Sequence, residues 1–170
     1  MPSSSSEYVC KLCGQSHSGL PTDTAYTLPD VVWDIPESER AEKAKWNSDL
    51  CQLGDRYFIR CLLEVPFLDL PGYYGWGAWA EVDWLSFEKY LQFYDKDGTN
   101  EAPLPARLAN DLPTYGGTLG LEVLIQFRTA SERPAILFPA ESTNTLAAEV
   151  RRGMSYARFL EVLVARGVEL

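Results

Sequence analysis

The feature that most constrains the fold is the stretch DLCQLGDRYFIRCLLEVP, residues 49–66, in which two apolar runs flank Gly54-Asp55. A Gly-Asp pair between two such runs is typical of the two-residue turn of a β-hairpin. This turn fixes the register, in which the facing pairs are Leu53 with Arg56, Cys51 with Phe58, and Asp49 with Arg60. We expect Asp49 and Arg60 to form a cross-strand ion pair.

The second strand of this hairpin has one uniformly apolar face, because side chains alternate along a strand. That face carries Tyr57, Ile59, Cys61, Leu63 and Val65. Cys51 pairs with Phe58 and therefore lies on the opposite, mixed face. Free cysteine is among the most buried residue types, so we predict that Cys61 lies in the core and that Cys51 lies on an accessible face.

The remaining patterns predict further strands and helices. We expect an exposed helix over residues 36–46, a strand over 75–84 and a helix over 87–94 that begins after Ser86 as N-cap. Residues 95–118 read as a long loop, and residues 119–128 read as a strand that pairs with 133–139. Two helices end the chain, the second with an apolar stripe from Tyr156 to Val164. The order predicts an α+β fold, an antiparallel sheet with helices packed on one face.

The chain length of 170 residues suits one domain. We expect a disordered lead-in over residues 1–7 and a single domain over 8–170. Within that domain, residues 8–36 form a loop-rich, zinc-knuckle-like segment, because glycines and prolines interrupt it, and residues 37–170 form the α+β core.

The net charge of −9 disfavours two classes of partner, nucleic acid and anionic membranes. A protein partner is compatible with it. No apolar run approaches the ~20 residues of a transmembrane helix, and the start MPSSSSEY lacks the features of a signal peptide. We therefore expect a cytoplasmic protein.

The stretch CKLCGQSH, residues 10–17, begins as a zinc knuckle does. Two thiolates two residues apart can bind one ion, and the glycine permits a tight turn beneath it. His17, the only histidine of the chain, lies close enough to be a third ligand, and Cys51 is the better of the remaining cysteines for the fourth. The sequence predicts a structural zinc site of Cys10, Cys13, His17 and Cys51. A redox pair and plain loop residues remain the alternatives.

Other chemistry has little support in the sequence. A single histidine leaves no Ser-His-Asp arrangement if His17 binds a metal, and no phosphate-binding glycine motif occurs. Trp76, Trp79 and Trp84 either line a ligand groove or pack in and around the core, and we favour packing. Glu81 and Asp83 share a strand face, which we interpret as solvated.

Five stretches resemble the bacterial family called domain of unknown function 2199. They are CKLCGQSHSGLP, SDLCQL, YFIRCLLEVP, WGAWAEV and LAAEVRRGMS, and the resemblance runs from about Cys10 to about Arg166. It implies no established activity, and it places Cys10, Cys13, His17 and Cys51 in the recurring motifs. The chain departs from the family pattern at Cys61, where the pattern has glycine, and at ESTNT before Leu146, where it has a histidine-proline pair.

Together these features predict a small cytosolic bacterial protein that binds or regulates a partner and carries a structural zinc site. An immunity-like protein is the specific version of this hypothesis. The alternative is a metalloenzyme in which one zinc coordination position stays open for water. The number of protein ligands distinguishes the two, because four ligands close the site and three leave it open.

Overall fold

The computed structural model describes residues 7–9 and 16–170, with side chains from residue 19 onward. Its strands are β1 (Glu7–Val9), β2 (Ser16–Ser18), β3 (Asp23–Ala25), β4 (Ala44–Trp46), β5 (Leu50–Leu53), β6 (Arg56–Pro66), β7 (Tyr73–Val82), β8 (Leu104–Leu108), β9 (Glu122–Gln126) and β10 (Ala135–Leu137). Its helices are α1 (Asp30–Trp33), α2 (Glu37–Lys43), α3 (Trp84–Phe93), α4 (Thr145–Arg152) and α5 (Tyr156–Ala165).

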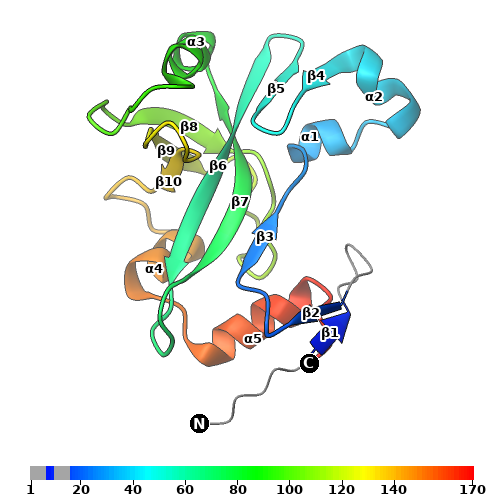
Figure 1. Cartoon of the computed structure of the whole chain (residues 1–170), viewed down its shortest axis with the longest axis vertical. Coiled ribbons are helices and arrows are strands. Elements are labelled where there is room, and N and C mark those ends of the chain that lie inside the picture. Colours follow the sequence, from blue (N-terminus) through cyan, green and yellow to red (C-terminus); the bar gives the residue numbers. More distant parts are fainter. Residues whose placement is uncertain (1–6, 10–15) are drawn as a thin grey trace.

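Five strands close into a small barrel in the order β6-β7-β8-β9-β10 and back to β6 (Figure 1). Most pairings are antiparallel, but β10 lies parallel to β6, and β3 lies parallel to β7. The α+β class is thus confirmed, whereas the purely antiparallel sheet was wrong: the sheet is mixed, and its two ends meet.

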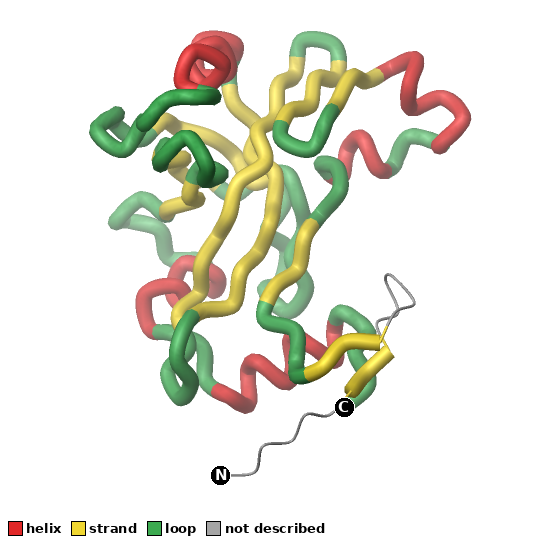
Figure 2. The backbone as a smooth tube through the Cα atoms, in the orientation of Figure 1, coloured by secondary structure: helices red, strands yellow, loops and turns green. Residues whose placement is uncertain are grey.

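The two longest strands, β6 and β7, each exchange neighbours along one edge. The edge of β6 pairs first with β5, up to Ile59, and then with β10 at Leu62. The edge of β7 pairs with β3 from Gly75 to Gly77 and then with β8 from Ala80. Strands β3, β4 and β5 therefore splay away from the barrel wall, as the tube in Figure 2 shows.

The barrel interior holds the main core, and helices close its ends. The apolar face predicted for β6 points inward, with Ile59, Cys61, Leu63 and Val65 fully buried. Phe87 and Tyr90 of α3 join this core, and so do residues of α4 and α5 from the far side (Figure 1). We expected the helices to pack on one face of a sheet, and this was wrong. A closed barrel has two ends to cover, and the helices lie at these ends.

A second apolar cluster lies on the outer face of the sheet. Cys51 and Phe58 pack there against Leu28 and Val32, which come from the α1 region, and against Trp79. The predicted separation of the two cysteines onto opposite faces is confirmed, because Cys61 belongs to the barrel core. The predicted accessibility of Cys51 was wrong: the residue is 1% exposed.

The hairpin register is confirmed at Leu53–Arg56 and Cys51–Phe58. Asp49 lies opposite Arg60, whose backbone N–H donates to the Asp49 carbonyl at 2.9 Å. The expected ion pair between their side chains does not form, because the Asp49 carboxylate accepts hydrogen bonds from Tyr94 and Arg133 instead.

Several element boundaries differ from the sequence-based expectation. The exposed helix ends at Lys43, and β4 follows it. Helix α3 begins three residues early, because Asp83 caps it by accepting from the Ser86 N–H at 2.8 Å. Strand β8 interrupts the segment that we read as a loop. The pairing of β9 with β10 and the two terminal helices are confirmed.

The tryptophans bear out the packing interpretation. Trp76 and Trp79 are fully buried, and Trp84 is 47% exposed. Among the described residues, the helices are all too short or too polar to cross a membrane.

Candidate functional site

A cleft of about 600 Å³ opens where β5 and β10 leave the same edge of β6. Its floor is β6, where Cys61, Leu62 and Glu64 contribute to the lining. The segment between β9 and β10, residues 127–134, forms one wall, and α3 forms another. A volume of this size falls in the range of small-molecule sites, ~300–1,000 Å³.

The α3 wall is aromatic. Tyr90 and Phe93 line the cleft from α3, Tyr94 lines it from the C-cap of that helix, and Phe127 lines it from the residue after β9. Phe127 lies 5.5 Å from Tyr90 and 5.9 Å from Phe93 between ring centroids. Tyr90 and Phe127 are buried and form the base of this wall, and the half-buried Phe93 packs on them. Tyr94 is 45% exposed and lines the cleft. Aromatic surface next to polar groups is typical of ligand sites.

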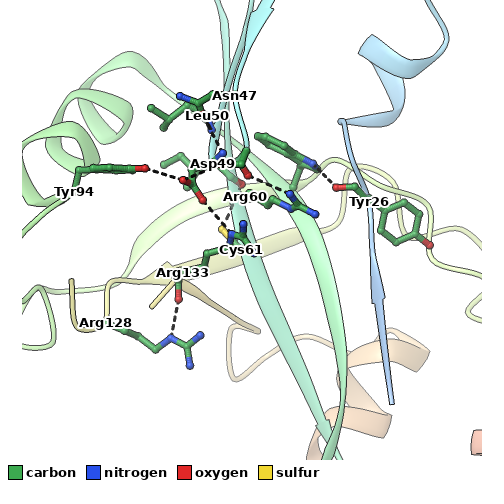
Figure 3. A network of polar contacts seen from close by, with 12 residues as sticks. Tyr26, Asn47, Asp49, Leu50, Arg60, Cys61, Tyr94, Arg128 and Arg133 are labelled. Atoms are coloured by element: carbon green, nitrogen blue, oxygen red, sulfur yellow. Dashed lines mark hydrogen bonds and ion pairs between the residues drawn. The ribbon is translucent and has the colours of Figure 1, made fainter. Parts of the chain in front are cut away.

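Asp49 joins the walls at the mouth of the cleft. Its carboxylate accepts from the Tyr94 hydroxyl at 2.7 Å and from Arg133 Nε at 3.1 Å, as Figure 3 shows. Burial by itself raises the pKa of this carboxyl, but the hydrogen bonds from Tyr94 and Arg133 outweigh it and lower the pKa below its ordinary value. Asp49 is therefore ionised at neutral pH.

Arg128 is tied to the same wall. Its Nε donates to the Arg133 carbonyl at 2.8 Å (Figure 3). Its Nη1 lies 3.4 Å from Glu64 and 3.5 Å from Glu132. The backbone at both ends of the wall is also held: Gly98 N–H donates to the Arg128 carbonyl, and Leu62 N–H donates to the Pro134 carbonyl, each at 2.9 Å. The arginine-bearing wall is thus fixed to β6 and to the loop after α3.

Arg60 lies beside this network, on the outer side of β6. Its Nη1 donates to the Ser48 carbonyl at 3.2 Å, whereas its Nε is buried and has no hydrogen-bond partner within the described part of the chain. Burial lowers the pKa of Arg60, and the nearby charge of Arg133 lowers it further. The Asp49 carboxylate binds Arg133 and not Arg60, so the Arg60 side chain has no carboxylate partner among the described residues.

Of the four predicted zinc ligands, only Cys51 has a side chain within the described part of the structure. Cys10 and Cys13 lie outside the described residues, and the side chain of His17 does as well. In Figure 1, β2, which contains His17, lies at the same end of the molecule as α5, whereas β5, which contains Cys51, lies at the opposite end. The four-ligand site therefore stays a prediction.

The environment of Cys51 opposes an exposed thiolate. Burial among apolar side chains raises the pKa of the Cys51 thiol to about 11. Burial also raises the pKa of Cys61 well above its ordinary value. Within residues 19–170, no three His, Cys, Asp or Glu side chains gather closely enough to hold a metal ion.

A second polar cluster lies between the terminal helices, away from the cleft. Glu149 of α4 is 3% exposed and accepts from the Tyr115 hydroxyl at 2.7 Å and from Arg158 Nε of α5 at 2.9 Å. Every oxygen of this carboxylate has a partner. The cluster joins α4 to α5 and to the loop before β9, and we assign it a structural role.

Sequence reasoning missed the cleft residues Tyr94, Arg128 and Arg133. They lie in a segment that we read as a helix end and a short turn, and nothing local to them marks a site. A weak signal was present: the exposed segment between β9 and β10 carries two arginines among small polar residues, in the sequence RTASER.

A protein-family model matches residues 9–154 of the chain, and it is described as an uncharacterized protein conserved in bacteria, DUF2199. Comparison with curated proteins found no match. Comparison with solved structures found no match either.

Proposed function

Since the chain belongs to the DUF2199 family, whose description names no activity, we propose from the structure that it is a binding protein and that the cleft beside β6 is its ligand site. The observation that carries this proposal is the aromatic wall of Phe93 and Tyr94, backed by the buried rings of Tyr90 and Phe127, at a cleft of about 600 Å³. An aromatic wall in a concave site binds the apolar body of a ligand.

A binding role fits the chemistry of the cleft better than catalysis does. The Cys61 thiol on its floor is fully buried and donates to the Ile59 carbonyl at 3.4 Å, and burial raises its pKa. A thiol in that state is a poor nucleophile, because the thiolate is the reactive form. The hydrogen bonds from Tyr94 and Arg133 lower the pKa of Asp49, which favours its ionised form over a general acid.

The test uses N-phenyl-1-naphthylamine, a neutral aromatic probe whose fluorescence rises in apolar surroundings. We expect saturable binding to the wild-type protein. Ala130 lines the cleft on an exposed loop, so Ala130→Trp should fill the cleft and abolish binding without disturbing the core. Ala102→Trp, on another exposed loop that does not line the cleft, is the matched control. Binding that survives Ala130→Trp would refute the assignment of the site.

A zinc site in the N-terminal segment is a second proposal, supported by the Cys-x2-Cys-Gly spacing of Cys10 and Cys13 and by His17. Cys13→Ser should remove the metal from protein purified without added zinc, as measured by mass spectrometry of bound metals. The same measurement on Cys51→Ala then tests whether Cys51 is the fourth zinc ligand. Loss of metal in that variant supports the closed structural site, and retention supports the open coordination position of a metalloenzyme.

The acidic composition supports a protein partner for the binding role, and that partner would be basic. An immunity-like protein would bind in this way. With a net charge of −9, such association would be fast at low salt and would weaken as salt screens the charges. Rates of association with a candidate partner at two ionic strengths test this version.

A further inference from the structure

We infer that the ligand of the cleft beside β6 carries an anionic group next to an apolar or aromatic body, and that this anionic group displaces Asp49 from Arg133. This inference rests on the proposed binding function of the cleft. It adds the ligand's charge and names the residue with which the ligand competes.

Two arginines supply hydrogen-bond donors to the cleft. Within the described residues, Arg133 uses only its Nε, which donates to Asp49, so both of its terminal nitrogens are available at the mouth of the cleft. Arg128 makes its contacts through Nε and Nη1, so within the described residues its Nη2 is also available to donate to a ligand. Guanidinium donors in a planar fork match the two oxygens of a carboxylate, sulfonate or phosphate.

The charged side chains of the cleft are unevenly paired. The five charged residues that line the cleft include two arginines and three carboxylates, but the carboxylates Glu64 and Glu132 lie near Arg128. Asp49 is the one carboxylate within 4 Å of Arg133 in the described structure, and the nearby Arg60 has no carboxylate partner and a buried Nε without a hydrogen bond there. One more negative charge here would offset the repulsion between these two arginines.

The aromatic side chains lie next to the arginine-bearing wall. Tyr94 donates its hydroxyl to the same carboxylate that Arg133 binds, so the α3 wall and the arginine wall meet at Asp49. A ligand whose body packs on Tyr94 and Phe93 therefore brings its polar end to Arg133. Asp49 occupies that position in the structure, as an internal competitor for the arginine.

The experiment compares two probes with the same body. 1-Anilinonaphthalene-8-sulfonate carries a sulfonate, and N-phenyl-1-naphthylamine lacks it. We expect the sulfonate probe to bind the wild-type protein about tenfold more tightly, because one hydrogen bond to a charged group accounts for a difference of about this size. Arg133→Gln should remove this preference and leave the neutral probe unchanged, and Arg133→Lys should keep only part of it, because lysine lacks the fork.

Asp49→Asn gives the sharpest result. Removing the competing charge should tighten binding of the sulfonate probe, again about tenfold, although the substitution deletes a residue of the site. Arg107→Gln and Asp55→Asn are matched controls, because they make the same charge changes at exposed positions that do not line the cleft. Neither control should alter the ratio of the two affinities.

The outcomes separate the two proposals. If both probes bind equally, compete with each other and are blocked by Ala130→Trp, the cleft binds ligands but the inferred anion preference is wrong. Weaker sulfonate binding in Asp49→Asn would also overturn the inference, because Asp49 would then help to bind the ligand. If neither probe is sensitive to Ala130→Trp, the proposed function itself fails.

Discussion

Replacement of Arg158 by alanine should destabilise the protein more than any exposed ion pair can explain. Arg158 donates from Nε and Nη2 to Glu149, at 2.9 and 3.3 Å, and Glu149 is 3% exposed. The substitution leaves a buried carboxylate with the Tyr115 hydroxyl as its remaining hydrogen-bond donor. An uncompensated buried charge is costly, because the protein interior solvates it poorly.

The magnitude follows from burial. Removal of one partner of a buried pair costs about 3–5 kcal/mol. The Arg158 side chain is 25% exposed, so water reaches one side of the pair, and we expect the lower end, about 3 kcal/mol. For a chain of this length that loss lowers the melting temperature by roughly 6–12 °C.

Urea unfolding followed by circular dichroism measures the free energy, and calorimetry measures the melting temperature. Arg107→Ala is the control, because Arg107 and Glu122 are 3.9 Å apart with side chains 64% and 79% exposed, and it should cost less than about 1 kcal/mol. The double variant Glu149→Gln/Arg158→Ala should be more stable than Arg158→Ala, since it removes the stranded charge. A loss below about 1 kcal/mol in Arg158→Ala, matching an exposed pair, would refute the reasoning.

Three further predictions follow from single residues. Cys61→Ala should lower the free energy of unfolding by about 1 kcal/mol and leave any metal content unchanged, because Cys61 packs in the barrel core; loss of bound metal would contradict this. Gly98→Ala should cost about 1–3 kcal/mol in urea unfolding, because a Cβ there would lie 2.6 Å from Phe127 Cβ; an unchanged midpoint would contradict it. Asp49, whose pKa is lowered in the folded protein, stabilises it above its unfolded pKa of about 4, and this contribution is lost as the pH falls below that value; acid unfolding of Asp49→Asn should therefore begin from lower stability at neutral pH and show a smaller pH dependence.

The sequence allowed the hairpin of β5 and β6 to be predicted down to its register, because the information is local. A two-residue turn and a two-residue period determine which side chains share a face, and Cys61 followed the rule. The same reasoning misjudged Cys51. Its face is covered by Leu28 and Val32, which lie about twenty positions earlier and carry no local sign of where they pack.

The closure of the barrel could not be predicted from the sequence, because it also depends on contacts between distant parts of the chain. It depends on one parallel contact between β6 and β10, at Leu62 and Ala135, which joins distant parts of the chain. Short strands such as β3 and β10, three residues each, give almost no periodic signal. The polar network of the cleft is equally non-local, because Asp49 meets Tyr94 45 positions away and Arg133 84 positions away.

The exchange of partners along β6 explains why a site can form on so small a barrel. Barrels of this size fill their interior with side chains, so a ligand needs space outside the wall. That space arises where β5 turns away from β6 and β10 has not yet begun. The wall that carries Arg128 and Arg133 is an exposed loop, yet backbone hydrogen bonds at Arg128 and Pro134 fix both of its ends. Binding groups held in this way keep their geometry before a ligand arrives, which reduces the entropy lost on binding.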